Sequence, residues 1–156
     1  MKVSLVVINE QVKSRALDAV RSLSFDEPHT VKIEPVEKNR SIAQHRLKWL
    51  WVSDIADFGG ETKEEANRRL KKRFLVPIFE RDDAEYAAMI ETVREVHRQG
   101  MKEQAVKLFD RIVDMTRSSD ASVKQMAEFL TDIEQDCGAV QIPLRRPEDL
   151  YREAMR

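Results

Sequence analysis

Residues 41–58 have the sequence SIAQHRLKWLWVSDIADF and carry the signals of a helix at both ends. Ser41 and Gln44 stand three residues apart, as in a capping box, where each side chain satisfies a free backbone N–H of the first turn. Gly59 and Gly60 end the pattern. On a helical wheel, one face holds Leu47, Leu50, Trp51, Ile55 and Phe58, and the opposite face holds Ile42, His45, Trp49, Val52 and Ala56. A helix that is apolar on two faces is buried on both, so we expect one face in the chain's own core and the other against a further helix, a second subunit or a ligand.

The residues before this helix show strand-like and helical patterns in turn. Residues 2–9 are rich in Val, Leu and Ile, and residues 30–36 alternate apolar and polar side chains, so each segment predicts a strand. Between them, residues 10–23 have the apolar spacing of a helix. Pro35 has no N–H for a sheet ladder, so the second strand should end there or lie at an edge.

The residues after it predict helices only. Thr62 with Glu65 forms a second capping box and starts a helix over 62–74, which Pro77 should end. Ser122 with Gln125 forms a third. The remaining predicted helices cover residues 83–98, 101–117, 122–137 and, after Pro147, a short tail up to residue 155.

The fold expected from these patterns is α+β, with a small N-terminal β-α-β unit followed by a mostly helical remainder. We expect a single domain over residues 1–156. Residues 1–74 would be its β-α-β-α-α part with the basic motif region, and residues 75–156 its acidic helical part.

Composition sets limits on function. Of 156 residues, 42% are hydrophobic and 35% charged, and 27 Lys and Arg against 28 Asp and Glu leave a net charge of −1. This excludes a protein that is basic over its whole surface and a disordered acidic tail protein. The net charge is 0 in residues 1–31, +4 in residues 32–73 and −5 in residues 74–156. A basic middle and an acidic C-terminal half can offer two different surfaces to partners.

Cys137 is the only cysteine, so an internal disulfide is excluded and a reducing compartment is expected. It lies late in an amphipathic helix, where a small buried hydrophobe is a better interpretation than a nucleophile. The apolar start, Val3 to Ile8, is too short to span a membrane and lacks a signal-peptide cleavage region. We therefore expect a soluble, cytoplasmic protein that does not associate with membranes.

Residues 39–49 contain Asn39, Arg40, Ser41, Gln44, Arg46 and Trp49 at the spacing N-R-S-x-x-Q-x-R-x-x-W. This pattern resembles the signature of the NinB (lambda Orf-like) family of phage recombination proteins. The resemblance covers residues 1–74 fairly well and residues 118–144 loosely. Residues 77–117, which predict two helices, stand where better-known members have a short, partly stranded segment, and residues 145–156 are this chain's own arrangement.

The resemblance implies a homodimer that binds single-stranded DNA non-specifically and does not hydrolyse it. Such a recombination mediator would help a strand-annealing or strand-exchange recombinase act on DNA coated by single-strand-binding protein. If the chain is phage-encoded, it would work in the host cytoplasm. It would need no cofactor and would not be an enzyme.

Two groups of cations are candidates for the DNA-binding site. The first is Arg40, Arg46 and Lys48 around the motif helix, with Gln44 near the helix N-terminus and Trp49 as a ring on which a base could stack. Capping is the favoured role for Gln44, and a core position for Trp49 stays equally open. The second group is five cations within six residues: Arg68, Arg69, Lys71, Lys72 and Arg73. Cations suit a helix C-terminus, but five neighbouring ones repel one another unless an anion relieves them, so we favour phosphate binding.

Two alternatives stay open. The chain could be a protein–protein adaptor without DNA contact, whose working surface is the acidic side of the last long helix, with Glu128, Asp132, Glu134 and Asp136. It could also, with less support, be a metal-dependent nuclease that uses Asp54, Asp57 and Glu61 followed by Lys63. A helix break separates Asp57 from Glu61, whereas that chemistry usually places its acids on adjacent strands. Three scattered His residues and one Cys do not suggest a metal site.

Overall fold

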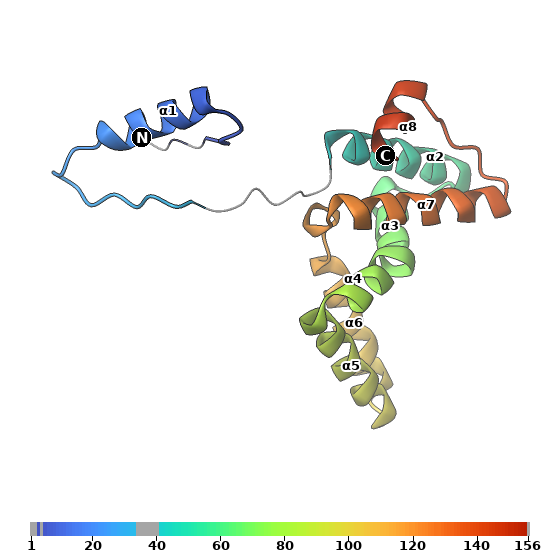
Figure 1. Ribbon diagram of the computed structural model, residues 1–156. Helices are drawn as coiled ribbons and strands as arrows, with labels where there is room; N and C mark the ends of the chain where they lie inside the picture. The colour runs from blue at the N-terminus through green and yellow to red at the C-terminus, as the bar shows by residue number, and fades with distance from the viewer. Residues whose placement is uncertain (1–2, 4, 34–40, 156) are drawn as a thin grey trace. The chain divides into compact units, whose positions relative to one another are not determined.

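The computed structural model describes residues 3, 5–33 and 41–155 (Figure 1). Over these residues every regular element is a helix, and no strand occurs. The expected α+β class with an N-terminal β-α-β unit is therefore wrong. The chain divides into two units, Met1–Glu37 and Lys38–Arg156.

The first unit contains one helix, α1 (Glu10–Arg21), which confirms the helix predicted within 10–23. The Asn9 side chain caps it by accepting a hydrogen bond from the Val12 N–H at 2.9 Å. The strands predicted over 2–9 and 30–36 are wrong wherever these residues are described, and residues 34–36 lie outside the described part. Apolar and β-branched residues form a strand only where a partner strand and a buried face are available. Here Ile8 and Ile33 are exposed.

The second unit holds the remaining helices. They are α2 (Ile42–Gly59), α3 (Lys63–Leu70), a π-helical segment (Lys71–Leu75), α4 (Val76–Asp82), α5 (Ala84–Arg98), α6 (Lys102–Met115), a 3-10 turn (Ser118–Asp120), α7 (Val123–Ala139) and α8 (Glu148–Ala154). All three predicted capping boxes are formed, at the N-termini of α2, α3 and α7. Among the described helices, none combines the length and apolar character that crossing a membrane requires.

Helix α2 packs against α3, α7 and α8 (Figure 1). Its buried residues form one wide side instead of the two opposite faces expected from the wheel. Gln44 and Lys48 lie between those two faces and are themselves buried, whereas Ile42 and Phe58 are exposed. The prediction of two separate buried faces is wrong because it assumed that the polar side chains between them are exposed. A polar group can be buried when it has a hydrogen-bond partner.

The segment after α7 returns across α2 and is fixed there by polar contacts. The Trp51 indole N–H donates to the Arg145 carbonyl at 2.7 Å. The Asp54 carboxylate accepts from the backbone N–H of Arg145 at 2.9 Å and from its guanidinium at 2.7 Å. Tyr151 of α8 then packs its ring near Trp51, with the ring centres 6.2 Å apart. The C-terminal residues therefore close the core over α2.

The helix that begins at Lys63 does not end before Pro77, as the sequence predicts, but runs through the π segment into α4. In that segment the Val76 N–H donates to the Lys71 carbonyl, five residues earlier. A proline in an α-helix lacks an N–H and presses against the carbonyl four residues before it. The wider π turn just before Pro77 relieves this conflict and allows the helical run to continue to Asp82.

Candidate nucleic-acid interface

The cations of residues 68–73 lie at the end of α3 and in the π segment, and most of them bind groups of the chain itself. The Arg68 guanidinium contacts Asp114 at 2.8 Å and Asp110 at 3.2 Å, both on α6. Its hydrogen bonds to these carboxylates raise the pKa of Arg68 above its usual value. Arg69 pairs with Glu61, which precedes α3. These two cations are therefore already neutralised by carboxylates.

Lys71 serves the C-terminal end of α6. Its ammonium donates to the Thr116 carbonyl at 2.9 Å and to the Val113 carbonyl at 3.2 Å. Burial lowers the pKa of Lys71. The last carbonyls of a helix have no intrahelical donor, and Lys71 supplies donors from outside the helix.

Arg73 and Lys72 have different neighbours. Arg73 pairs with Asp136 of α7 at 2.8 Å, and the Lys72 ammonium lies 5.4 Å from the centre of the Phe109 ring of α6. The second distance is within the range of cation–π contacts. The group as a whole joins α3 and the π segment to α6 and α7. Phosphate binding by residues 68–73 stays a prediction, and carboxylates of this chain already relieve much of the repulsion on which it was based.

The motif residues on α2 divide into buried and exposed ones. Gln44 has 1% of its surface exposed and donates its side-chain amide to the Val123 carbonyl at 2.9 Å. Lys48 has 3% exposed and donates to the Ser118 hydroxyl at 3.2 Å. Arg46 is exposed and makes no ion pair with any described residue. Arg40 lies outside the described residues.

Trp49 is half-buried, and its ring contacts the Lys48 ammonium and the His45 ring. The Lys48 ammonium is 4.2 Å from the centre of the Trp49 ring. The His45 ring meets Trp49 edge-on, with the ring centres 6.4 Å apart and an interplanar angle of 83°. Ile42 and Arg46 follow on the same side of the helix at spacings of three and four residues.

We call this surface the α2 outer face and define it as Ile42, His45, Arg46 and Trp49. It combines an aromatic ring, an unpaired guanidinium and an exposed apolar side chain. An aromatic ring beside a cation is the arrangement that proteins use for sequence-independent contacts with single-stranded nucleic acid. Arg46 and Trp49 lie together on this face, and of the other predicted site residues Arg69, Lys72 and Arg73 are also exposed, at the end of α3 and in the π segment.

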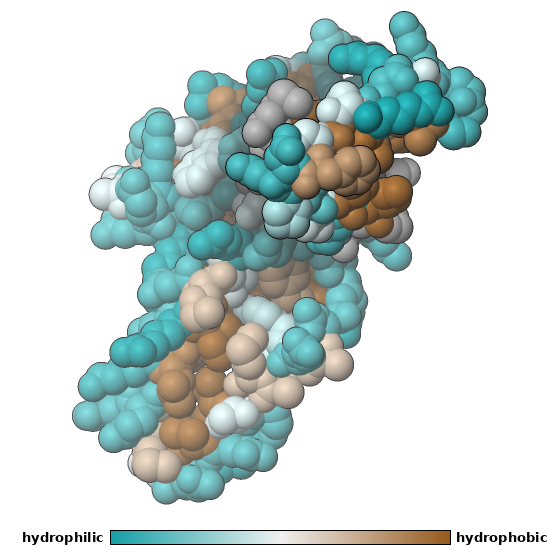
Figure 2. Space-filling model, turned by 90° about the vertical axis from the view of Figure 1, so that its left-hand side faces the viewer, coloured by the Kyte–Doolittle hydropathy of each residue, from teal (hydrophilic) through white to brown (hydrophobic). Residues whose placement is uncertain are grey.

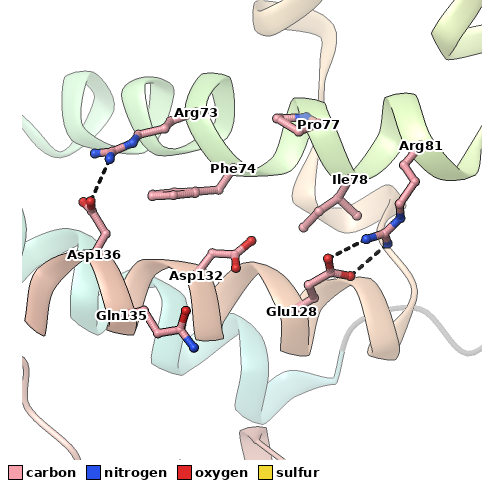
Figure 3. Close-up of a pocket in the computed structure, with 9 residues that line it drawn as sticks. All are labelled: Arg73, Phe74, Pro77, Ile78, Arg81, Glu128, Asp132, Gln135 and Asp136. Carbon is pink, nitrogen blue, oxygen red and sulfur yellow. Dashed lines mark hydrogen bonds and ion pairs between the residues drawn. The ribbon is translucent and has the colours of Figure 1, made fainter. Parts of the chain in front are cut away.

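A cleft of about 600 Å³ lies between α7 and the run formed by the π segment and α4 (Figure 3). Phe74, Pro77 and Ile78 form its apolar side. An ion pair closes it at each end: Arg73 with Asp136 at 2.8 Å, and Arg81 with Glu128 at 2.6 Å.

Asp132 lies between these two ion pairs and has no described cation as a partner of its own (Figure 3). Burial, and secondly the neighbouring Glu128 carboxylate, raise the pKa of Asp132. The sequence pointed to the acidic residues of α7 but not to Phe74 or Ile78. Ile78 reaches the cleft because the helix continues past Pro77, and Phe74 lies in the π segment just before it.

The acidic residues considered for a metal-dependent nuclease do not form a common site. Two of them bind arginines of this chain. Asp54 accepts two hydrogen bonds from Arg145, and Glu61 pairs with Arg69. Asp57 is exposed near the end of α2. Within the described part of the chain, no three His, Cys, Asp or Glu side chains are grouped closely enough to hold a metal ion. Burial raises the pKa of the Cys137 thiol, which reduces its reactivity.

Comparisons of the chain with protein-family models, with curated proteins and with solved structures gave no match. The resemblance of residues 39–49 to the NinB signature therefore stands on the motif alone.

Proposed function

We propose that the protein is a recombination accessory protein that binds single-stranded DNA without sequence preference. In this proposal it assists a recombinase on DNA coated by single-strand-binding protein. The observation that carries the proposal is the α2 outer face, where Arg46 and Trp49 of the family-like motif are accessible together. The resemblance of the motif supplies the biological setting.

The contacts at Trp49 support binding of an unpaired base. A base can stack on an indole face whatever its identity, and such stacking contributes about 1–3 kcal/mol per base. The Lys48 ammonium already lies over the ring and is held by Ser118, so a positive charge is fixed beside the stacking surface. Arg46, one turn away, is free to contact a phosphate.

Fluorescence anisotropy with a dye-labelled oligothymidylate tests the proposal. Trp49→Ala should weaken binding about tenfold, corresponding to the loss of one stacked base. Trp49→Phe, which keeps an aromatic face, should lose much less, and this comparison separates stacking from structural damage. Lys102→Ala is the control, because Lys102 is an exposed cation on α6. Absence of binding to single strands at low salt would overturn the proposal.

The salt dependence reports which cations take part. Because most cations of residues 68–73 are paired internally, two or three phosphate contacts are expected, with a slope of log affinity against log salt of about −2. A slope near −3.5, the value for about five contacts, would show that DNA displaces the internal ion pairs. A slope near zero would contradict DNA binding altogether.

A protein–protein adaptor is the second candidate, and the cleft on α7 favours it. Asp132 offers a carboxylate that pairs with no cation in the described part of the chain, beside the apolar side chains of Phe74 and Ile78. This combination suits a partner's basic side chain with an apolar stem. A mobility-shift experiment on single- and double-stranded oligonucleotides separates the two candidates, since the adaptor would shift neither.

A further inference from the structure

Three carboxylates follow one another along the side of α7 that lines the cleft of Figure 3. They are Glu128, Asp132 and Asp136, spaced four residues apart, which is about 6 Å per step along a helix. Cations of the opposite helical run bind the two outer ones: Arg81 contacts the first at 2.6 Å, and Arg73 contacts the last at 2.8 Å. Among the described residues, no cation pairs with the middle carboxylate. The series therefore contains three carboxylates but only two ion pairs.

The two ion pairs define how α7 faces the run formed by the π segment and α4. The arginines are eight residues apart in the chain, and so are their carboxylates, in the opposite order. The residues midway between them are Pro77 and Asp132, and both line the cleft. Figure 3 shows the Asp132 carboxylate directed toward the opposite run, between the two pairs. The position that faces Asp132 is thus occupied by a proline, which cannot supply a cation.

Both guanidinium groups of the cleft already have other partners. The Arg81 guanidinium donates two hydrogen bonds to Asp82 and two to Glu128, at 2.6–2.9 Å. Arg73 has its own ion pair and lies over the Phe74 ring, 5.0 Å from the ring centre. Turning either guanidinium toward the middle carboxylate would break these contacts. Among the described residues that line the cleft, one negative charge is therefore left without a cation.

The surroundings of Asp132 favour a cation with an apolar stem. Burial, and secondly the Glu128 carboxylate, raise the pKa of Asp132, so a nearby positive charge would stabilise its ionised form. Phe74 is half-buried and Pro77 is exposed, and both offer apolar surface in the same cleft. The cleft measures about 600 Å³, within the range of pockets that hold ligands. An arginine side chain matches these features, because its planar guanidinium pairs with carboxylates and its stem can lie on apolar surface.

Apolar surface alone does not distinguish the cleft. Exposed apolar side chains also gather along α5 and α6, in the lower part of Figure 2, and include Met89 and Met115. The cleft differs because its middle carboxylate has a defined place in a series of ion pairs. Charge complementarity therefore indicates which kind of side chain the cleft takes.

We propose that the cleft binds an arginine side chain of a partner protein. The guanidinium pairs with Asp132 and its stem packs against Phe74 and Pro77, which completes the series of arginine–carboxylate pairs along α7. The proposal specifies the partner chemistry of the adaptor candidate and rests on that candidate. It does not depend on DNA binding, because Arg46 and Trp49 lie on the α2 outer face and not in the cleft.

Selection of a random peptide library displayed on phage, with the full chain as bait, tests the proposal. The recovered peptides should share an arginine with apolar neighbours, and the Asp132→Asn chain should not recover them. Peptides without an arginine, such as apolar ones that bind α5 and α6, would overturn the proposal but leave the adaptor candidate standing. Recovery of no peptide at all would contradict both.

Fluorescence anisotropy of one recovered peptide measures the contact. Asp132→Asn, and glutamine in place of the peptide's arginine, should each weaken binding at least about tenfold, as the loss of a charged hydrogen bond does. Asp57→Asn is the control, because it makes the same change at an exposed acid near the end of α2. Lysine in place of the peptide's arginine should bind more weakly, because lysine lacks the planar pair of donors. Equal binding of the lysine peptide would overturn the choice of arginine.

Substitution of Pro77 tests the position that lacks a cation. Pro77→Arg supplies a cation opposite Asp132 from within the chain and should weaken peptide binding at least about tenfold. Pro77→Ala removes the proline without adding charge and should bind like the wild type, and circular dichroism verifies the helix content of both variants. Trp49→Ala, which should weaken DNA binding, should leave peptide binding unchanged. If Pro77→Ala loses as much binding as Pro77→Arg, or if Asp132→Asn binds like the wild type, the proposal is wrong.

Discussion

The side-chain amide of Gln44 forms hydrogen bonds with backbone groups at the N-termini of two helices, α2 and α7. Its oxygen accepts from the Ser41 N–H at 3.0 Å, and its nitrogen donates to the Val123 carbonyl at 2.9 Å. The matching residues of the other two capping boxes, Gln125 and Glu65, sit progressively closer to solvent. The same local motif should therefore contribute different amounts to stability at the three sites, because a buried group left without a partner is costly.

Gln44→Ala should lower the free energy of unfolding by about 2–3 kcal/mol, since it leaves buried backbone groups unsatisfied. Glu65→Ala should lower it by about 0.5–1 kcal/mol, the usual contribution of an exposed cap, and Gln125→Ala should fall between them. Urea denaturation of the three variants measures the order. Equal losses would show that burial does not add to the role of Gln44.

Asp82 and Glu128 make the free energy of unfolding depend on pH, and stability should fall at acidic pH. Hydrogen bonds from Arg81, and for Asp82 also from Gln125, hold the pKa of both carboxyls below their usual values. A carboxyl with a lowered folded-state pKa stabilises the fold above its unfolded pKa, near 4, and loses this effect as the pH falls.

The free energy of unfolding should therefore decline as the pH drops below about 4. In Arg81→Gln the decline should be shallower, because the main cause of both shifts is gone. Urea denaturation at several pH values between 6 and 2.5 measures it, with Lys102→Gln as the control that keeps the wild-type slope. Identical slopes in Arg81→Gln and the wild type would contradict this assignment.

At the scale of elements, side chains of α3 and the π segment bind two other helices of the second unit, α6 and α7. Arg68 and Lys71 hold α6, and Arg73 holds α7. The cluster of cations in residues 68–73 is visible in the sequence, but the carboxylates and carbonyls that bind these cations are not. Asp114 and Asp136 lie tens of residues away, and neither spacing nor composition indicates which distant carboxylate a given arginine will meet.

Variants of this run should rank by burial. Lys71→Ala should cost about 1–3 kcal/mol, because the Thr116 carbonyl loses the Lys71 donor and the Val113 carbonyl keeps only the Thr116 N–H. Arg68→Ala and Arg73→Ala should cost at most about 1 kcal/mol each, as exposed ion pairs do. Lys72→Ala should be close to neutral. Thermal denaturation gives the ranking, and a Lys72→Ala loss as large as that of Lys71→Ala would refute it.

At the scale of the whole molecule, the helices could be predicted, whereas the two predicted strands are absent from the described residues of 2–9 and 30–36. Three helices begin with a capping box whose two residues stand three positions apart, at Ser41, Thr62 and Ser122. A short stretch of sequence is therefore enough to predict where each of these helices begins. Segments such as 2–9 carry β-forming residues, but a strand also needs a distant partner that no short pattern identifies. Arg46 and Trp49 could be named as candidate site residues from their spacing, and their contact with DNA stays a prediction. The burial of Lys48 depends on Ser118, seventy residues away.

The closure of the core by the C-terminal residues belongs to this scale as well. Tyr151 connects three elements: its ring packs near Trp51 of α2, and its hydroxyl donates to Glu134 of α7 at 3.0 Å. Glu134 is also bound by Arg146 at 2.9 Å. Trp51 is fully buried, and part of its cover therefore comes from α8.

Tyr151→Ala should lower the free energy of unfolding by about 2–4 kcal/mol, because it opens a cavity beside Trp51. Tyr151→Phe keeps the ring and loses only the hydrogen bond, so it should cost about 1 kcal/mol. Both values come from urea denaturation followed by tryptophan fluorescence. The folded Tyr151→Ala variant should also emit at a longer wavelength than Tyr151→Phe, because water reaches the Trp51 indole. If the two variants lose equal stability and emit alike, the contribution of α8 would lie in the Glu134 hydrogen bond and not in covering the core.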